Sequence, residues 1–211
     1  MIGHLIGYTY YLEVIMIEIN KNLTAYAENV EGEIKNKDSM DLTCLVVPYR
    51  SFKIHYDLLP VSQHYKVERF LTRARVVVKN PSRLKFKLSC GELTHKTLKI
   101  IGLGGIECDD EEFDNKFWYR ANNKEIAEQL MVAEIRKTLV SFNDVHLDFV
   151  KEHSMDVNCI EGESCIILSS SEIMVSQERI GEVILLMKNL IDRMINLVIT
   201  DNKATQTNLL K

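Results

Sequence analysis

The spacing of hydrophobic residues changes period along the chain, and its longest regular stretch lies near the C-terminus. From Ser176 to about Ile199, apolar residues recur every three or four positions, which is the spacing of one face of a helix. Ser176 can cap the helix, and Glu178 places negative charge in the first turn, where the helix dipole favours it. A sheet or another helix must cover so broad a face, so we predict that upstream strands pack on it. The face consists of Ile180, Val183, Ile184, Met187, Leu190, Ile191, Met194, Leu197 and Val198.

The first half of the chain begins with helical spacing and then changes to alternation. Residues 11–30 carry apolar positions three and four apart, which predicts a helix with one buried face that stops at Gly32. Residues 33–41 are polar and indicate a loop. Alternation of apolar and polar residues then predicts strands with one buried face. These strands cover residues 44–47 and 52–58, followed by a connection at 60–65.

Residues 70–90 have the pattern of a β-hairpin. Two alternating runs, 72–79 and 84–90, flank Asn80-Pro81-Ser82, which is typical of a turn. If Lys79 faces Arg83 across the turn, then Val77 faces Lys85, and the basic residues lie on one side of the hairpin. The resulting stripe is a candidate surface for an anion or an acidic partner. Its members are Arg73, Arg75, Lys79, Arg83, Lys85 and Lys87.

The second half alternates between strands and helices without a regular βαβ repeat. Residues 117–120 read as a strand, and a helix or helix pair follows to about Ser141. Three further strands are predicted at 145–151, 155–160 and 164–168. Short links between strands favour antiparallel pairing, so the predicted class is α+β, an antiparallel sheet covered by N-terminal, middle and long C-terminal helices. We expect one domain over residues 1–200 and a flexible polar tail at 201–211.

Composition narrows the class of protein only a little. With 46% hydrophobic and 27% charged residues, the chain resembles an ordinary globular protein. A net charge of -4 gives no overall attraction to nucleic acid, and no stretch has the length and composition of a membrane span. Five scattered cysteines without a signal peptide predict reduced thiols and a cytoplasmic protein.

Motifs for catalysis, metal binding or cofactor binding are weak throughout the sequence. The glycines at 102–105 lead into the acidic run 107–114, which would repel phosphate, so we interpret them as a turn. The acidic run itself indicates a solvated loop rather than a calcium site, because adjacent carboxylates diverge. Cys159 and Cys165 flank a turn and fit a disulfide, a shared metal or two buried thiols. We therefore assign no catalytic, cofactor or metal residue.

One part of the sequence is similar to known families. Phe113-Asp114-Asn115-Lys116-Phe117, followed by Ala127, Leu130 and Leu139, resembles several uncharacterised prokaryotic families with an "FD..F" strand, a leucine-bearing helix and a long last helix. Tyr49–Ile54 and Thr72-Arg73 are similar to their early strands. The resemblance covers most of residues 44–198. It implies an α+β fold and no catalytic residues, and some relatives carry a membrane anchor before the domain.

These observations favour a non-catalytic module that binds a protein partner or a second copy of itself. Leu185 and Leu186 lie off the main apolar face of the last helix and form a candidate interface. An overlying loop or the N-terminal helix would explain them equally well. The alternatives are a small-ligand binder or enzyme whose site assembles only in space, and nucleic-acid binding through the hairpin at 70–90, which lacks interleaved aromatic residues.

Overall fold

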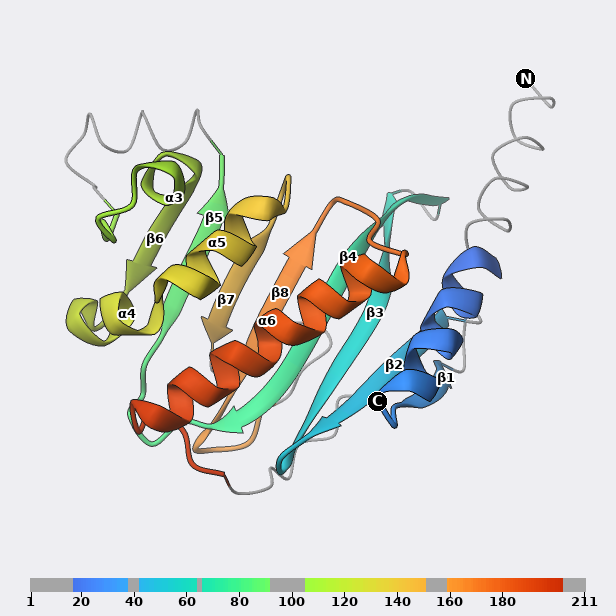
Figure 1. Cartoon of the computed structure of the whole chain (residues 1–211), viewed down its shortest axis with the longest axis horizontal. Coiled ribbons are helices and arrows are strands. Elements are labelled where there is room, and N and C mark those ends of the chain that lie inside the picture. The colour runs from blue at the N-terminus through green and yellow to red at the C-terminus, as the bar shows by residue number, and fades with distance from the viewer. Residues whose placement is uncertain (1–16, 38–41, 64–65, 92–104, 151–158, 203–211) are drawn as a thin grey trace.

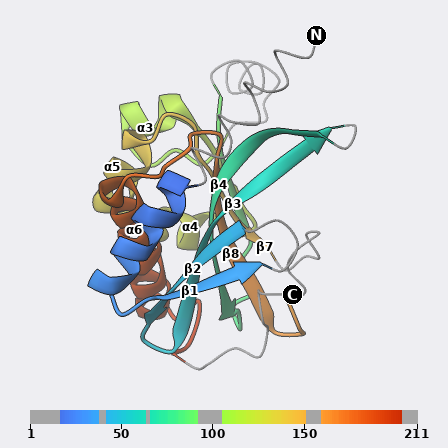
Figure 2. The ribbon, with the colours of Figure 1, turned by 90° about the vertical axis from the view of Figure 1, so that its right-hand side faces the viewer.

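The described chain forms two layers, a sheet and a set of helices on one side of it (Figures 1 and 2). The computed structural model describes residues 17–37, 42–63, 66–91, 105–150 and 159–202. The helices are residues 17–29, α3 (Glu111–Lys116), α4 (Lys124–Leu130), α5 (Ala133–Ser141) and α6 (Gln177–Asn196). The strands are β1 (Glu33–Lys37), β2 (Leu42–Tyr49), β3 (Phe52–Gln63), β4 (Lys66–Lys79), β5 (Phe86–Cys90), β6 (Phe117–Ala121), β7 (His146–Val150) and β8 (Glu163–Ser170).

The sheet has eight strands in the order β1-β2-β3-β4-β8-β7-β5-β6. Every neighbouring pair is antiparallel. Strands β1 to β4 follow one another as a meander, whereas β8 lies beside β4 at the centre. The predicted α+β class, with helices packed on an antiparallel sheet, is confirmed.

Helix α6 lies across the middle of the sheet (Figure 1), and upstream strands pack on it, as the hydrophobic spacing predicts. The Ser176 hydroxyl caps it by accepting a hydrogen bond from the Arg179 N–H at 3.2 Å. Leu186 is fully buried (0% exposed), whereas Leu185 is 55% exposed. The proposed Leu185–Leu186 interface is therefore wrong for Leu186, which belongs to the core. No helix in the described segments is long and apolar enough to cross a membrane.

The predicted hairpin at 70–90 does not form. Strand β4 pairs with β3 and β8, and β5 pairs with β6 and β7, so two strands separate the two runs. Asn80 fixes the turn that follows β4. Its side-chain N–H groups donate to Leu84 O at 2.8 Å and to Ser164 Oγ at 2.9 Å. These bonds tie the connection to the start of β8. Alternation fixes the face on which a side chain lies, but not the neighbouring strand.

Four shorter predictions also need correction. Residues 33–37 form the edge strand β1 instead of a loop, and β3 continues to Gln63 through the predicted connection. Phe113 and Asp114 are helical, so only Phe117 of the FD..F motif lies in a strand. Residues 111–114 of the acidic run lie in α3, and Asp110 is the N-cap of that helix. Predictions for residues 11–16, 38–41, 64–65, 102–104, 151, 155–158 and 203–211 lie outside the described residues.

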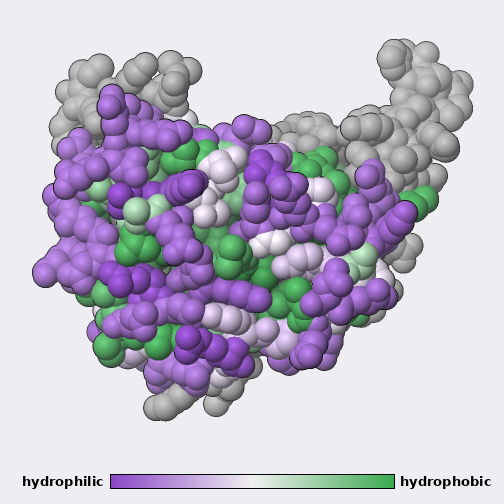
Figure 3. Space-filling view, viewed as in Figure 1, coloured by the Kyte–Doolittle hydropathy of each residue, from purple (hydrophilic) through white to green (hydrophobic). Residues whose placement is uncertain are grey.

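The surface of the helical side is mainly hydrophilic, with hydrophobic residues exposed in small groups between polar ones (Figure 3). The prediction that Val198 belongs to the covered face of the last helix is wrong, because Val198 lies just after α6 and has 77% of its surface exposed. It adopts the left-handed conformation, with φ of 57°. This conformation closes the helix, because the Ile199 N–H then donates to Met194 O at 2.9 Å. A β-branched residue is strained in that region of backbone space.

Replacing Val198 with glycine is therefore expected to raise the free energy of unfolding by about 1 kcal/mol. Glycine adopts the left-handed conformation without a Cβ clash, and the exposed valine contributes little burial. Urea and thermal unfolding measure the change, with a Tm increase of about 2–4 °C for each 1 kcal/mol in a chain of this size. Val198→Ala keeps the Cβ, so an equal gain in that variant would contradict backbone strain as the cause.

Candidate functional site

The face of the sheet turned away from the described helices, which we call the back face, carries ionisable side chains near its centre. Tyr56, Ala74 and Leu168 point into the core under the helices, so their neighbours along each strand point to the back face. Cross-strand pairing aligns these neighbours in rows. The central row comprises His55, Arg75, Ile167, Asp148 and Lys87, from β3, β4, β8, β7 and β5. The adjacent row comprises Cys44, Asp57, Arg73, Ser169 and His146.

Asp57 binds two arginines on this face. The Arg73 Nε and Nη2 groups donate to Oδ1 and Oδ2 of Asp57 at 2.9 and 3.0 Å, a bidentate pair. The Arg75 Nη2 group donates to Asp57 Oδ2 at 2.8 Å. All three side chains are buried. This carboxylate therefore acts as a fixed acceptor for two guanidinium groups and not as a free acid or base.

Arg75 retains hydrogen-bonding capacity that Asp57 does not use. Its side chain is 1% exposed, yet Nε and Nη1 have no hydrogen-bond partner in the part of the chain that the structure describes. A buried donor without a partner costs about 1–3 kcal/mol. Arginine cannot escape that cost by losing its proton in a protein. These two nitrogen atoms therefore indicate a position on the back face where a ligand with acceptor atoms would bind.

Asp148 has the complementary property in the same row. Its Oδ1 is buried without a hydrogen-bond partner among the described atoms, and its Oδ2 lies 4.0 Å from Lys87 Nζ. Burial raises the pKa of the Asp148 carboxyl, and Lys87 opposes that shift. Ile167 on β8 separates Asp148 from Arg75 in the row. The back face thus holds an unused donor and an unused acceptor with an apolar residue between them.

His55 lies on the other side of Arg75 and is held neutral. Burial, followed by the positive charge of Arg75, lowers the pKa of His55 to about 4. Its Nδ1 is 3.9 Å from the Cys44 sulfur, a long contact between two buried groups. A neutral imidazole with so low a pKa is a poor proton acceptor at neutral pH.

This shift predicts a specific loss of stability in acid. The unfolded chain binds a proton at His55 below pH of about 6.5, whereas the folded protein does so only near the lower pKa, so stability falls between these values by up to about 3 kcal/mol. His55→Gln is expected to flatten this part of the pH profile. Urea unfolding at several pH values between 7 and 5 measures it. Parallel profiles for the two proteins would contradict the assignment to His55.

Two cysteines lie together on this face, Cys165, which is buried, and Cys159, which is half-buried. Cys165 packs against Val77, with Cys159 alongside, and both cysteines are free. Burial raises the pKa of Cys165 to about 12 and that of Cys159 to about 11. Both therefore stay protonated at neutral pH, which makes them weak nucleophiles and weak metal ligands. Of the interpretations left open by the sequence, the buried thiol fits Cys165, whereas Cys159 is a half-buried thiol beside it.

The predicted basic stripe divides into two groups. Arg73 and Arg75 are buried beside Asp57. Lys79 is half-buried and lies opposite Glu163 of β8. Arg83 and Lys85 are exposed and line a depression that also contains Glu161 and Glu163, and Lys87 is exposed beside Asp148. The six residues do not form a continuous basic surface.

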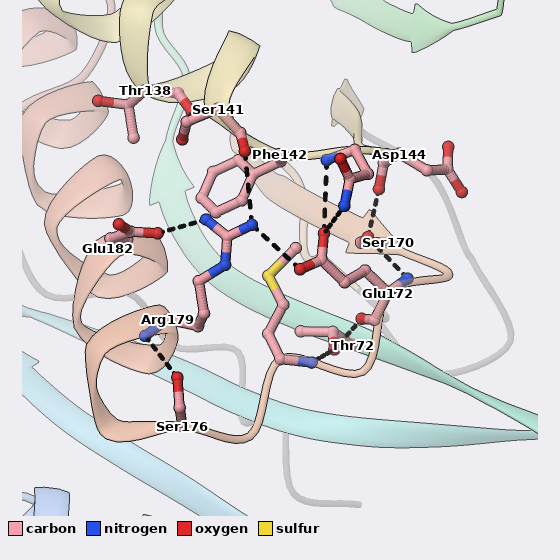
Figure 4. Close-up of polar contacts among 12 residues, drawn as sticks. Thr72, Thr138, Ser141, Phe142, Asp144, Ser170, Glu172, Ser176, Arg179 and Glu182 are labelled. Carbon is pink, nitrogen blue, oxygen red and sulfur yellow. Dashed lines mark hydrogen bonds and ion pairs between the residues drawn. The ribbon is translucent and has the colours of Figure 1, made fainter.

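A second polar cluster ties the start of α6 to the sheet (Figure 4). The Arg179 guanidinium lies over the Phe142 ring and donates to Glu172 at 3.0 Å and to Glu182 at 2.7 Å. The Thr72 hydroxyl donates to the Glu172 carbonyl at 2.6 Å and accepts from the Met174 N–H at 2.9 Å. Arg179 thus has partners for its charge, so we interpret this cluster as structural.

The acidic run offers no convergent set of metal ligands. Asp110 pairs with Arg136 at 2.8 Å, and Asp114 accepts hydrogen bonds from the N–H groups of Cys108 and Asp110. Within the described segments, no group of three or more His, Cys, Asp or Glu residues could hold a metal ion. The acidic side chains with these contacts serve local structure.

Sequence reasoning missed Asp57 and Asp148, the two carboxylates that define the site. Each occupies an ordinary polar position in an alternating strand. Comparison with known proteins adds no further residue, because no family model, curated protein or solved structure significantly matches the chain. The candidate site therefore follows from geometry alone.

Proposed function

We propose that this protein is a non-catalytic binding module that recognises an anionic group on the back face of its sheet. The observation that carries the proposal is the buried Arg75 guanidinium, whose Nε and Nη1 have no hydrogen-bond partner in the described chain. Carboxylate and phosphate oxygens match the N–H groups of arginine in charge and in geometry. An oxyanion there satisfies donors that the described residues leave unused.

The neighbouring groups support binding over catalysis. Asp57 is committed to two arginines, and His55 has a pKa of about 4. Cys165, with a pKa of about 12, supplies no thiolate at neutral pH. The groups that flank Arg75 are thus neither free to transfer a proton nor ready to attack a carbon, which favours holding a ligand over catalysis.

The test is a titration of the protein with acetate and with inorganic phosphate, against chloride at equal ionic strength. Binding raises the free energy of unfolding by about 2.7 kcal/mol at a ligand concentration of 100 Kd. Phosphate also stabilises proteins in general by exclusion from their surface. The informative quantity is therefore the difference in Tm increase between the wild type and a variant. Arg75→Lys is expected to remove the saturable part of the Tm increase.

Arg120→Lys is the matched control, because Arg120 is exposed and lies beyond Lys87 in the cross-strand register. It should keep the wild-type response. Calorimetric titration of the wild-type protein gives a reading that does not depend on the folding of any variant. The proposal is overturned if neither anion produces a saturable heat, or if Arg75→Lys responds as the wild type does.

A further inference from the structure

We infer that the ligand is a linear zwitterion of the ω-amino acid class, with its carboxylate on Arg75 and its ammonium group on Asp148. This inference rests on the proposed function, because it takes Arg75 as the anion-binding group. It adds the second end of the ligand and the spacing between its charges. The observation behind it is that one cross-strand row holds both a buried unused donor and a buried unused acceptor.

The two groups have opposite charge and do not satisfy each other. Arg75 lies on β4 and donates to Asp57 on β3, so its guanidinium is held toward the side away from β7. Asp148 lies on β7, and β8 runs between the two strands. Neighbouring strands are about 4.8 Å apart, which places the backbones of β4 and β7 at about 10 Å. A ligand that pairs with both groups must therefore carry its charges well apart.

The surface between the two charged groups sets the chemistry of the ligand's middle. Ile167 stands between them, and Val77 and Cys165 lie next to it on the back face. Apolar side chains favour methylene groups over polar atoms. A short aliphatic chain between carboxylate and ammonium fits this order of cation, apolar surface and anion.

Asp148 favours an ammonium group at the far end of the ligand. Its Oδ1 accepts no hydrogen bond from any residue that the structure describes, and Lys87 at 4.0 Å from Oδ2 provides only a long ion pair. An ammonium group supplies three donors and a full positive charge, which compensates a carboxylate that has lost much of its water. A second carboxylate at that end would be repelled, so the site discriminates against diacids.

The experiment compares a series of linear amino acids by calorimetry and thermal unfolding. Glycine, β-alanine, γ-aminobutyrate and ε-aminocaproate differ only in the number of methylene groups between the charges. Caproate lacks the ammonium group, and hexylamine lacks the carboxylate. Affinity is expected to rise along the amino acid series, and ε-aminocaproate is expected to bind about tenfold or more tightly than caproate, since a hydrogen bond between charged groups contributes that much.

Asp148→Asn tests the ammonium end of the site. Asparagine has nearly the same shape as aspartate. Because burial raises the pKa of the Asp148 carboxyl, the negative charge there is unfavourable, and the unliganded variant should unfold at a higher temperature than the wild type. In this variant ε-aminocaproate should bind no better than caproate, while the affinity for acetate is unchanged. Asp109→Asn, at an exposed position, is the control for loss of one negative charge.

The outcomes separate the two proposals. If acetate and caproate bind through Arg75 but chain length, the ammonium group and Asp148→Asn make no difference, the zwitterion is wrong and the anion site stands. If short and long amino acids bind equally, the spacing argument is wrong. If no oxyanion binds at all, the proposed function fails, and the zwitterion inference fails with it.

Discussion

Replacing Asp57 with alanine is expected to lower the free energy of unfolding by about 3–5 kcal/mol, the usual result of removing one partner from a buried ion pair. The loss leaves the Arg73 and Arg75 guanidinium groups buried without the carboxylate that now accepts from both. Urea unfolding measures the change. Asp57→Asn keeps an oxygen acceptor at the same place, so it should cost less than Asp57→Ala.

A double-mutant cycle shows whether the cost comes from stranded charge. Arg75→Met fills a similar volume without charge or donors, so the Asp57→Ala, Arg75→Met double variant should recover part of the stability lost in Asp57→Ala. Simple additivity of the two single changes would mean that Asp57 and Arg75 do not interact energetically, against the 2.8 Å contact between them.

Adjacent leucines on α6 give the second large effect. Leu186→Ala is expected to lower the free energy of unfolding by about 2–5 kcal/mol, because truncation of a fully buried leucine leaves a cavity under the helix. Leu185→Ala changes an exposed side chain one residue away and should stay within about 0.5 kcal/mol of the wild type.

Chemical unfolding of both variants measures the two changes. Each variant is the control for the other, because both replace a leucine with alanine at adjacent positions of the same helix. A Leu186→Ala variant as stable as the wild type would contradict the packing of α6 on the sheet. A strongly destabilising Leu185→Ala would mean that this side chain is covered in solution by something outside the described chain.

The fold class was predictable because its signals are local. The three-to-four spacing from Ile180 to Met194 defines a buried face whatever the helix packs against. Alternation in residues 52–58 likewise fixes which side chains face the core. Alternation does not predict which strands are neighbours, because β5 shows the same alternation whether it pairs with β4 or with β7.

The candidate site was only half predictable for the same reason. Arg73 and Arg75 stand out in the sequence as basic residues on one side of a strand, which indicates a wet surface. Asp57 lies 16 and 18 residues earlier, and pairing of β3 with β4 brings it to them. Asp148 comes from still farther along the chain. No local pattern marks a charge that becomes buried through partners of this kind.

The central position of β8 has a consequence for synthesis on the ribosome. Strand β4 can pair with β3 as soon as both emerge, but its other edge waits for β8, and Asn80 must meet Ser164, 84 residues later. During that interval the meander carries an unpaired hydrophobic edge, the kind of surface that promotes aggregation and recruits chaperones. Nascent chains stalled before residue 163 are therefore the species in which such recruitment is strongest.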